Sequence, residues 1–142
     1  MQDLKSQDSG PDLSNGDLVY EKWAYEDDGT PYVERLYMQN LIYKSSRSKH
    51  YTKTKSYGAT GSVQVEADFS WNTSTKKVTV SNVSGRFNRG GGISGTRNAK
   101  TSKSGNGTSK ASASYSIEVN RNLGGWATYK VTLYCNYNGK TS

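Results

Sequence analysis

The stretch from residue 111 to residue 137, ASASYSIEVNRNLGGWATYKVTLYCNY, decides the fold of this chain. Its first part alternates apolar with polar residues from Ala111 to Val119, and its last part does the same from Tyr129 to Tyr137. A period of two is the signature of a strand with one buried face. The segment between them, from Asn120 to Gly125, is rich in turn-forming residues. The stretch therefore predicts a long antiparallel hairpin at the C-terminal end.

Shorter runs of the same kind precede this hairpin. Residues 62–71 alternate cleanly, and residues 77–84 return after a polar turn, with Val83 out of phase, which predicts a bulge. Residues 18–25 and 32–43 predict a second hairpin, because Asp28-Gly29 between them favours a tight turn. Residues 49–57 predict one more short strand. The stretch from Gly85 to Lys110 is poor in apolar residues, and we expect it to form the longest loop.

These runs predict an all-β fold of six to seven strands, as an antiparallel β-sandwich or, alternatively, a small open β-barrel. A length of 142 residues suits one domain. Residues 1–16 hold almost no apolar side chains, so we expect a flexible acidic and polar N-terminal segment there. Residues 17–142 are then a single β domain.

The net charge of +7 is unevenly distributed along the chain. Residues 1–34 hold nine acidic and two basic residues, whereas the remaining 108 hold seventeen basic and three acidic ones, a net charge of +14. One interpretation is that the acidic segment folds back on the basic body and neutralises part of it. The other is that the basic body faces an anionic partner. The two interpretations are compatible.

The single cysteine, Cys135, lies within an alternating run and is predicted to be a buried structural thiol, with an intermolecular bridge or a reactive nucleophile as alternatives. No apolar stretch approaches the length that spans a membrane. The polar residues that follow Met1 are what a chain with its leader removed would show, and the bias toward Tyr, Ser, Thr, Asn and Gly is typical of small exported bacterial β-proteins. We therefore expect a secreted or cell-surface protein.

Catalytic chemistry has few candidate residues. His50 is the single histidine, which leaves a serine or cysteine nucleophile short of a base and a zinc site short of ligands. Glu66 and Asp68 share one strand face and are predicted to be solvated, although two carboxylates are the minimum for glycoside hydrolysis. We expect neither an enzyme nor a cofactor.

The strongest binding candidate is residues 49–57, where Lys49, Tyr51, Lys53, Lys55 and Tyr57 share one strand face. Such a cationic ladder with aromatic ends suits phosphates or carboxylates of a ligand whose sugars or bases stack on the rings. The alternative is that lysines protect an edge strand from aggregation.

A second candidate is the glycine-rich stretch around Gly90-Gly91-Gly92, which is flanked by Arg86, Arg89 and Arg97. It matches GxGxxG by spacing, but that motif binds phosphate only between a parallel strand and a helix, so the match is interpreted as chance. The arginines and backbone amides could still hold an anion.

The sequence therefore predicts a non-catalytic, exported or cell-surface module that binds an anionic polymer or surface, such as a wall polymer or an acidic glycan. The ladder at residues 49–57 is the expected contact, with Arg86, Arg89 and Arg97 as a second one. The alternatives are a structural or protein-interaction domain that adds a strand at residues 49–57, or a secreted toxin or antimicrobial protein that acts on membranes. Nucleic acid is a weaker candidate, because no standard nucleic-acid-binding module is recognisable.

Overall fold

A computed structural model describes residues 16–40 and 47–142. Its strands are β1 (Asp17–Tyr25), β2 (Pro31–Asn40), β3 (Ser48–Ser56), β4 (Gly61–Asn72), β5 (Lys77–Arg89), β6 (Ile93–Ser104), β7 (Lys110–Arg121) and β8 (Gly125–Asn136). A short 3-10 turn, η2 (Gly58–Thr60), joins β3 to β4. No helix in the described ranges is long and apolar enough to cross a membrane.

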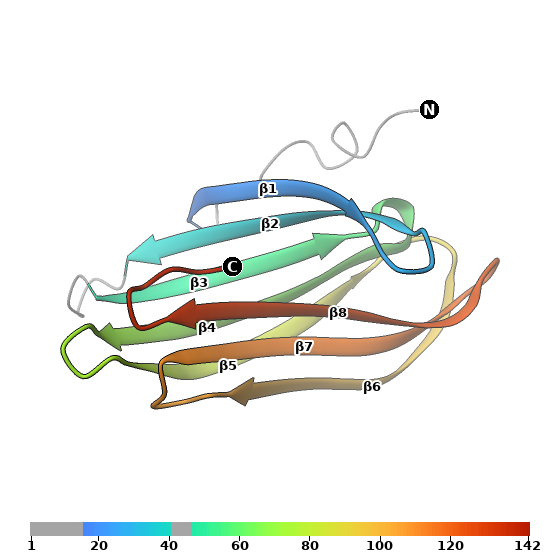
Figure 1. Ribbon diagram of the computed structural model, residues 1–142. Helices are drawn as coiled ribbons and strands as arrows, with labels where there is room; N and C mark the ends of the chain where they lie inside the picture. Colours follow the sequence, from blue (N-terminus) through green and yellow to red (C-terminus); the bar gives the residue numbers. More distant parts are fainter. Residues whose placement is uncertain (1–15, 41–46) are drawn as a thin grey trace.

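The strands form two antiparallel sheets that lie face to face (Figure 1). One sheet has the order β1-β2-β3-β4-β5 and the other the order β6-β7-β8, and neither sheet closes on itself. Every strand pairs with its neighbour in the chain, except that the chain changes sheet between β5 and β6. The predicted β-sandwich is confirmed, and the barrel alternative is not the fold.

The core lies between β3, β4 and β5 on one side and β7 and β8 on the other. The alternating runs supply it as predicted, because the positions 63–69 of β4, 111–119 of β7 and 129–135 of β8 that alternate as apolar are buried. Cys135 is fully buried in this core, as its phase predicted, and burial raises the pKa of its thiol to about 12. The thiol is therefore kept protonated and unreactive in the folded state.

The prediction of a long loop over 85–110 is wrong. β5 extends to Arg89, and a three-glycine turn leads directly into β6, so the described residues form eight strands rather than six or seven. β6 is an edge strand with polar residues on most of its length, so it has no apolar alternation to find. Gly85 lies within β5 because the ring of Tyr115 occupies the space of a side chain, with a ring carbon 2.4 Å from where a Cβ would be.

Two further sequence predictions concern local geometry. The bulge at Val83 is confirmed, since the pairing of β4 with β5 shifts by one residue between Glu66 and Asp68. Residues 49–57, in contrast, do not form an edge strand, because β3 lies between β2 and β4 in the larger sheet. A partner strand therefore cannot add at that position. The predicted N-terminal segment lies outside the described residues, apart from Gly16.

Candidate functional site

The face of β3 that carries the predicted ladder points into the sandwich rather than toward solvent. Tyr51, Lys53 and Tyr57 are only 5%, 6% and 6% exposed, while Lys49 and Lys55 are half-buried. Tyr57 stacks on Tyr129 of β8 with ring centroids 3.8 Å apart. The expectation that these side chains are open to a ligand is therefore wrong for the three buried ones. Both faces of residues 49–57 are polar, so the sequence pattern could not tell which of them turns inward.

Lys53 and Lys55 instead close the free edge of β8. The Lys53 ammonium donates to the carbonyl oxygen of Thr132 at 2.7 Å, and the Lys55 ammonium donates to that of Lys130 at 3.4 Å. The last part of that edge is paired with the C-terminal residues, where Ser142 exchanges two backbone hydrogen bonds with Tyr134 and Asn136 donates to the carbonyl oxygen of Lys140. Figure 1 shows the C-terminus lying beside β8. Edge carbonyls that would otherwise be unsatisfied thus have partners.

Two acidic residues from the first 34 positions neutralise these lysines, which agrees with one of the two interpretations of the charge division. The carboxylate of Glu34 lies 3.6 Å from the Lys53 ammonium and accepts a hydrogen bond from the Tyr20 hydroxyl at 3.0 Å. Glu26 pairs with Lys55 at 2.5 Å. Burial lowers the pKa of Lys53, and the nearby Glu34 carboxylate opposes that shift. Two of the five ladder residues, Lys53 and Lys55, therefore form structural ion pairs, and carboxylates of the protein already balance their charge.

The three arginines expected to form a second contact are separated. Arg86 is exposed on β5, and Arg97 lies on β6 in the other sheet. Arg89 donates a hydrogen bond to the carbonyl oxygen of Ile93 and so closes the turn at Gly90–Gly92. Because that turn leads into an antiparallel strand, the GxGxxG spacing has no phosphate-binding geometry.

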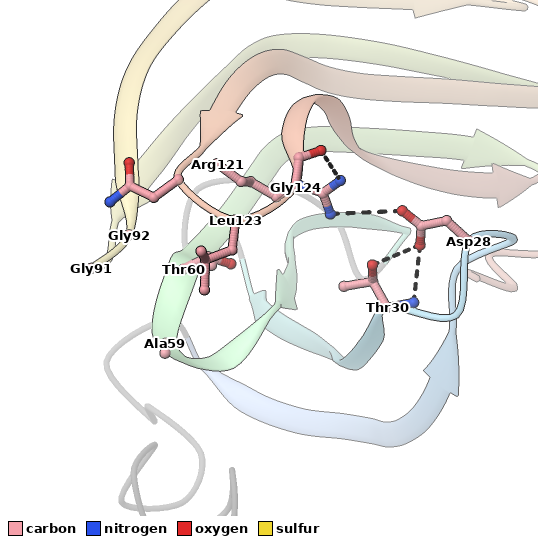
Figure 2. Close-up of a pocket in the computed structure, with 10 residues that line it drawn as sticks. Asp28, Thr30, Ala59, Thr60, Gly91, Gly92, Arg121, Leu123 and Gly124 are labelled. Carbon is pink, nitrogen blue, oxygen red and sulfur yellow. Dashed lines mark hydrogen bonds and ion pairs between the residues drawn. The ribbon is translucent and has the colours of Figure 1, made fainter.

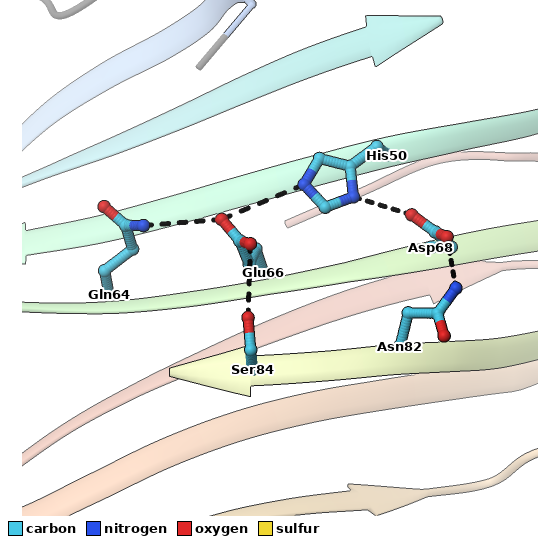
Figure 3. Close-up of polar contacts among 6 residues, drawn as sticks. All are labelled: His50, Gln64, Glu66, Asp68, Asn82 and Ser84. Carbon is cyan, nitrogen blue, oxygen red and sulfur yellow. Dashed lines mark hydrogen bonds and ion pairs between the residues drawn. The ribbon is translucent and has the colours of Figure 1, made fainter. Parts of the chain in front are cut away.

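His50, Glu66 and Asp68 form a polar network on the outer face of the larger sheet (Figure 3). The His50 ring contacts both carboxylates: Nδ1 lies 2.6 Å from Asp68 Oδ1, and Nε2 lies 3.9 Å from Glu66 Oε2. Asn82 Nδ2 donates to the second oxygen of Asp68 at 2.8 Å, and Ser84 Oγ to that of Glu66 at 3.2 Å. The carboxylates are thus cross-links between β3, β4 and β5 rather than solvated decoration.

This network has no metal-site geometry and no activated nucleophile. Within residues 16–40 and 47–142, no group of three or more His, Cys, Asp or Glu side chains could hold a metal ion. The Ser84 hydroxyl donates to Glu66 rather than to the histidine, so His50 does not act on it as a base. The sequence missed the network because only the β3–β4 register brings His50 opposite Asp68.

A different surface concentrates unmatched positive charge. The outer face of β6, β7 and β8, here called the basic face, presents four cations from the three strands: Arg97, Lys100, Lys110 and Lys130. The central strand contributes the small side chains of Ser112, Ser114 and Ser116, so the surface is recessed along the middle of the face. Register places Ser116 between Lys100 and Lys130, and these residues line a hollow of about 500 Å³.

Both carboxylate oxygens of Glu118, the one acidic residue of the basic face, accept hydrogen bonds from the protein. Arg97 Nε donates to its Oε1 at 2.7 Å and Asn98 Nδ2 to its Oε2 at 3.0 Å. A bulge in β6 and a positive φ of 56° turn Asn98 toward the carboxylate. The hydrogen bond from Arg97, then that from Asn98, lowers the pKa of Glu118. Lys100 and Lys130 make no ion pair within the part of the chain that the structure describes.

Two exposed aromatic rings mark the ends of the basic face on β8. Trp126 is 44% exposed, and the Arg97 guanidinium lies 3.9 Å from the centroid of its ring. Tyr134 is 39% exposed, and the Lys110 ammonium lies 4.6 Å from the centroid of its ring. Each ring is therefore held in place by a cation, with area left for a ligand.

A concavity lies at one end of the sandwich and is here called the loop-end cleft (Figure 2). Its volume is about 810 Å³, and its walls come from four connections: the β1–β2 turn, η2, the β5–β6 turn and the β7–β8 turn. Asp28 Oδ1 accepts hydrogen bonds from the backbone and side chain of Thr30, at 2.9 and 2.6 Å. The other oxygen, Oδ2, lies 3.7 Å from Arg121 Nη1.

Comparisons of the chain with known protein families, with curated protein sequences and with solved structures find no match. The functional argument therefore depends on the geometry of these surfaces.

Proposed function

We propose that this protein is an exported or cell-surface, non-catalytic module that binds an anionic polymer, an acidic glycan in particular, through the basic face. The observation that carries the proposal is the charge imbalance of that face, where four cations accompany one carboxylate that is already fully hydrogen-bonded. Positive charge that is unmatched within the protein favours an anionic partner. The buried lysines of β3 do not share in this role.

The spacing of the cations suits an extended ligand. Lys100, Ser116 and Lys130 are register partners on three adjacent strands, so their backbones span about 10 Å across the sheet. Long, flexible lysine side chains can reach acidic groups at different points along a chain. The serine row between them offers hydroxyl groups that donate and accept hydrogen bonds, as sugar hydroxyls require.

The aromatic rings add the second element of glycan recognition. Trp126 and Tyr134 lie eight positions apart on β8, roughly 27 Å along the strand. An amphipathic ring at each end provides apolar area for the faces of sugar rings while its polar atoms stay in water. A polymer that lies along β8 would meet a ring, then the lysine pair, then a second ring.

The test is binding to polygalacturonate, hyaluronan and dextran sulfate by isothermal calorimetry, with Lys100→Ala/Lys130→Ala as the variant. Each lysine contributes roughly 0.5–1 kcal/mol at an exposed site, so affinity should fall about five- to thirtyfold. Binding should also weaken as salt rises from 50 to 300 mM, because screening reduces attraction between exposed charges.

The matched control is Lys76→Ala/Lys77→Ala, which removes the same charge from the exposed end of the β4–β5 hairpin, at the last turn residue and the first residue of β5. It should leave affinity within about twofold of the wild type, because a substitution at a site distant from the basic face acts independently of that face. Equal losses in the two variants, or affinity that does not depend on salt, would contradict the proposal. Binding to single-stranded DNA that exceeds binding to all three glycans would assign the face to nucleic acid instead.

A further inference from the structure

Three neighbouring concavities run from the basic face to the end of the sandwich, and the loop-end cleft is the last of them. The hollow beside Lys100 and Lys130 is also lined by Thr128. Thr128 lines the next hollow as well, a groove of about 290 Å³ that includes Trp126 and Arg121 on one side and the acidic residues Glu26, Asp27 and Asp28 of the β1–β2 turn on the other. Arg121 in turn lines the loop-end cleft. Because each hollow shares a wall with the next, a chain that lies along β8 can continue past Trp126 and into the cleft.

The chemistry of the cleft differs from that of the basic face. Its two charged side chains, Asp28 and Arg121, oppose each other, so the cleft has no excess charge. Arg121 Nε and Nη2 donate to the carbonyl oxygens of Gly125 and Gly124, and Asp28 Oδ1 accepts from Thr30. The remaining atoms, Arg121 Nη1 and Asp28 Oδ2, are 3.7 Å apart, which is longer than a hydrogen bond and leaves these two atoms for a hydroxyl group of a ligand. Leu123 is completely exposed at the tip of the β7–β8 turn and provides apolar area beside them. A carboxylate, a guanidinium and an apolar surface together suit an uncharged sugar.

The cleft is also bounded on the sides that face away from β8. Ala59 and Thr60 of η2 form one wall, and Gly91 and Gly92 of the β5–β6 turn form another. Asp28 and Thr30 form the wall on the β1–β2 turn, where the Asp28 side chain accepts one hydrogen bond from the backbone and one from the side chain of Thr30 (Figure 2). A chain that enters from β8 therefore meets the turns at the end of the other sheet.

We propose that the loop-end cleft binds the terminal, uncharged sugar of a glycan whose acidic units lie over Lys100 and Lys130. The inference rests on the proposed function and adds to it recognition of the chain end. The protein would then bind at the ends of a polymer rather than at random along it.

The experiment uses hyaluronan oligosaccharides, in which acidic and uncharged sugars alternate, prepared with either kind of sugar at the non-reducing end. Calorimetry should show about tenfold tighter binding of chains that end in the uncharged sugar. The Leu123→Asp variant, which adds a charge to the cleft at a fully exposed position, should abolish that difference while salt-dependent binding of both chains persists. Thr73→Asp, at an exposed turn between β4 and β5, is the matched control and should keep the difference.

The outcomes separate the two proposals. Equal affinity for the two chain types would overturn the terminal site but not the proposed role of the basic face. The same holds if neither chain type binds to a protein that does bind polygalacturonate. Preference for the acidic end overturns it as well. Absence of salt-dependent binding to any of the polymers removes the proposed function and with it this inference.

Discussion

Replacing Lys53 with methionine separates a structural role for the β3 lysines from a ligand-binding role. The ammonium donates to the carbonyl oxygen of Thr132 at 2.7 Å and lies 3.6 Å from the Glu34 carboxylate, and its side chain is only 8% exposed. Loss of a hydrogen bond to a charged group costs about 1.5–3 kcal/mol. The unpaired Glu34 adds to that cost, whereas the apolar methionine side chain avoids the desolvation penalty of a buried charge.

We therefore expect Lys53→Met to lower the free energy of unfolding by about 2–3 kcal/mol and Tm by about 6–10 °C. Urea denaturation followed by the fluorescence of the three tryptophans measures the first quantity. Lys100→Met is the matched control, because Lys100 is exposed and makes no ion pair among the described residues. It should leave stability within about 0.5 kcal/mol of the wild type.

Polymer binding should show the opposite pattern. At a temperature where both variants are folded, Lys53→Met should bind polygalacturonate as the wild type does, and Lys100→Met should bind it more weakly. If Lys53→Met proved as stable as the wild type and lost binding, the face of β3 would be the ligand surface after all, and the reasoning from its burial would be refuted.

Three further predictions follow from the core. Gly85→Ala should destabilise the protein by about 1–3 kcal/mol in urea, because the new Cβ would overlap the Tyr115 ring; Gly95→Ala, whose Cβ would meet nothing within 4 Å, should be near neutral, and equal effects would argue against the packing. Cys135 should resist iodoacetamide at pH 8 in the native protein and react fully in urea, since burial raises its pKa to about 12; rapid labelling of the native protein would contradict its burial. Burial also raises the pKa of Tyr51 from 10.0 to about 12, so its contribution to stability is complete below pH 10 and is lost above it at about 1.4 kcal/mol per pH unit. Melting temperatures from pH 9 to 12 should fall less steeply in Tyr51→Phe, and identical slopes would rule out this contribution.

The alternating runs were sufficient to predict most of the larger sheet and the C-terminal hairpin. Residues 62–71 and 111–137 carry strong period-two patterns because their inward positions are apolar and their outward positions are polar. The pattern failed for β6, where pairing with β7 rather than burial of apolar side chains defines the strand. Backbone hydrogen bonding leaves no mark on side-chain chemistry, so the sequence of that segment is indistinguishable from that of a loop.

The candidate site was less predictable than the fold. The sequence indicated a basic body with an anionic partner as one interpretation, but it expected the lysines of β3 to face a ligand, whereas the structure buries Lys53 inside the sandwich. The sequence predicts an anion contact at Arg97 from its place beside the glycines, and in the structure Arg97 lies on the same surface as Lys100 and Lys130. Those lysines are thirty positions apart, so only the pairing of β6, β7 and β8 brings them to either side of Ser116.

The sequence by itself determined the class of fold, the buried thiol of Cys135 and the division of charge, because each of these depends on local pattern or composition. The tertiary structure alone decided which lysines are buried and which are exposed. A polar strand such as β3 presents no apolar face to mark its inward side, and its burial follows from the overlap of the larger sheet with the edge of β8. Since the free energy of an ion pair depends on its distance from solvent, the same residue type is structural in β3 and available for binding on β6 and β8.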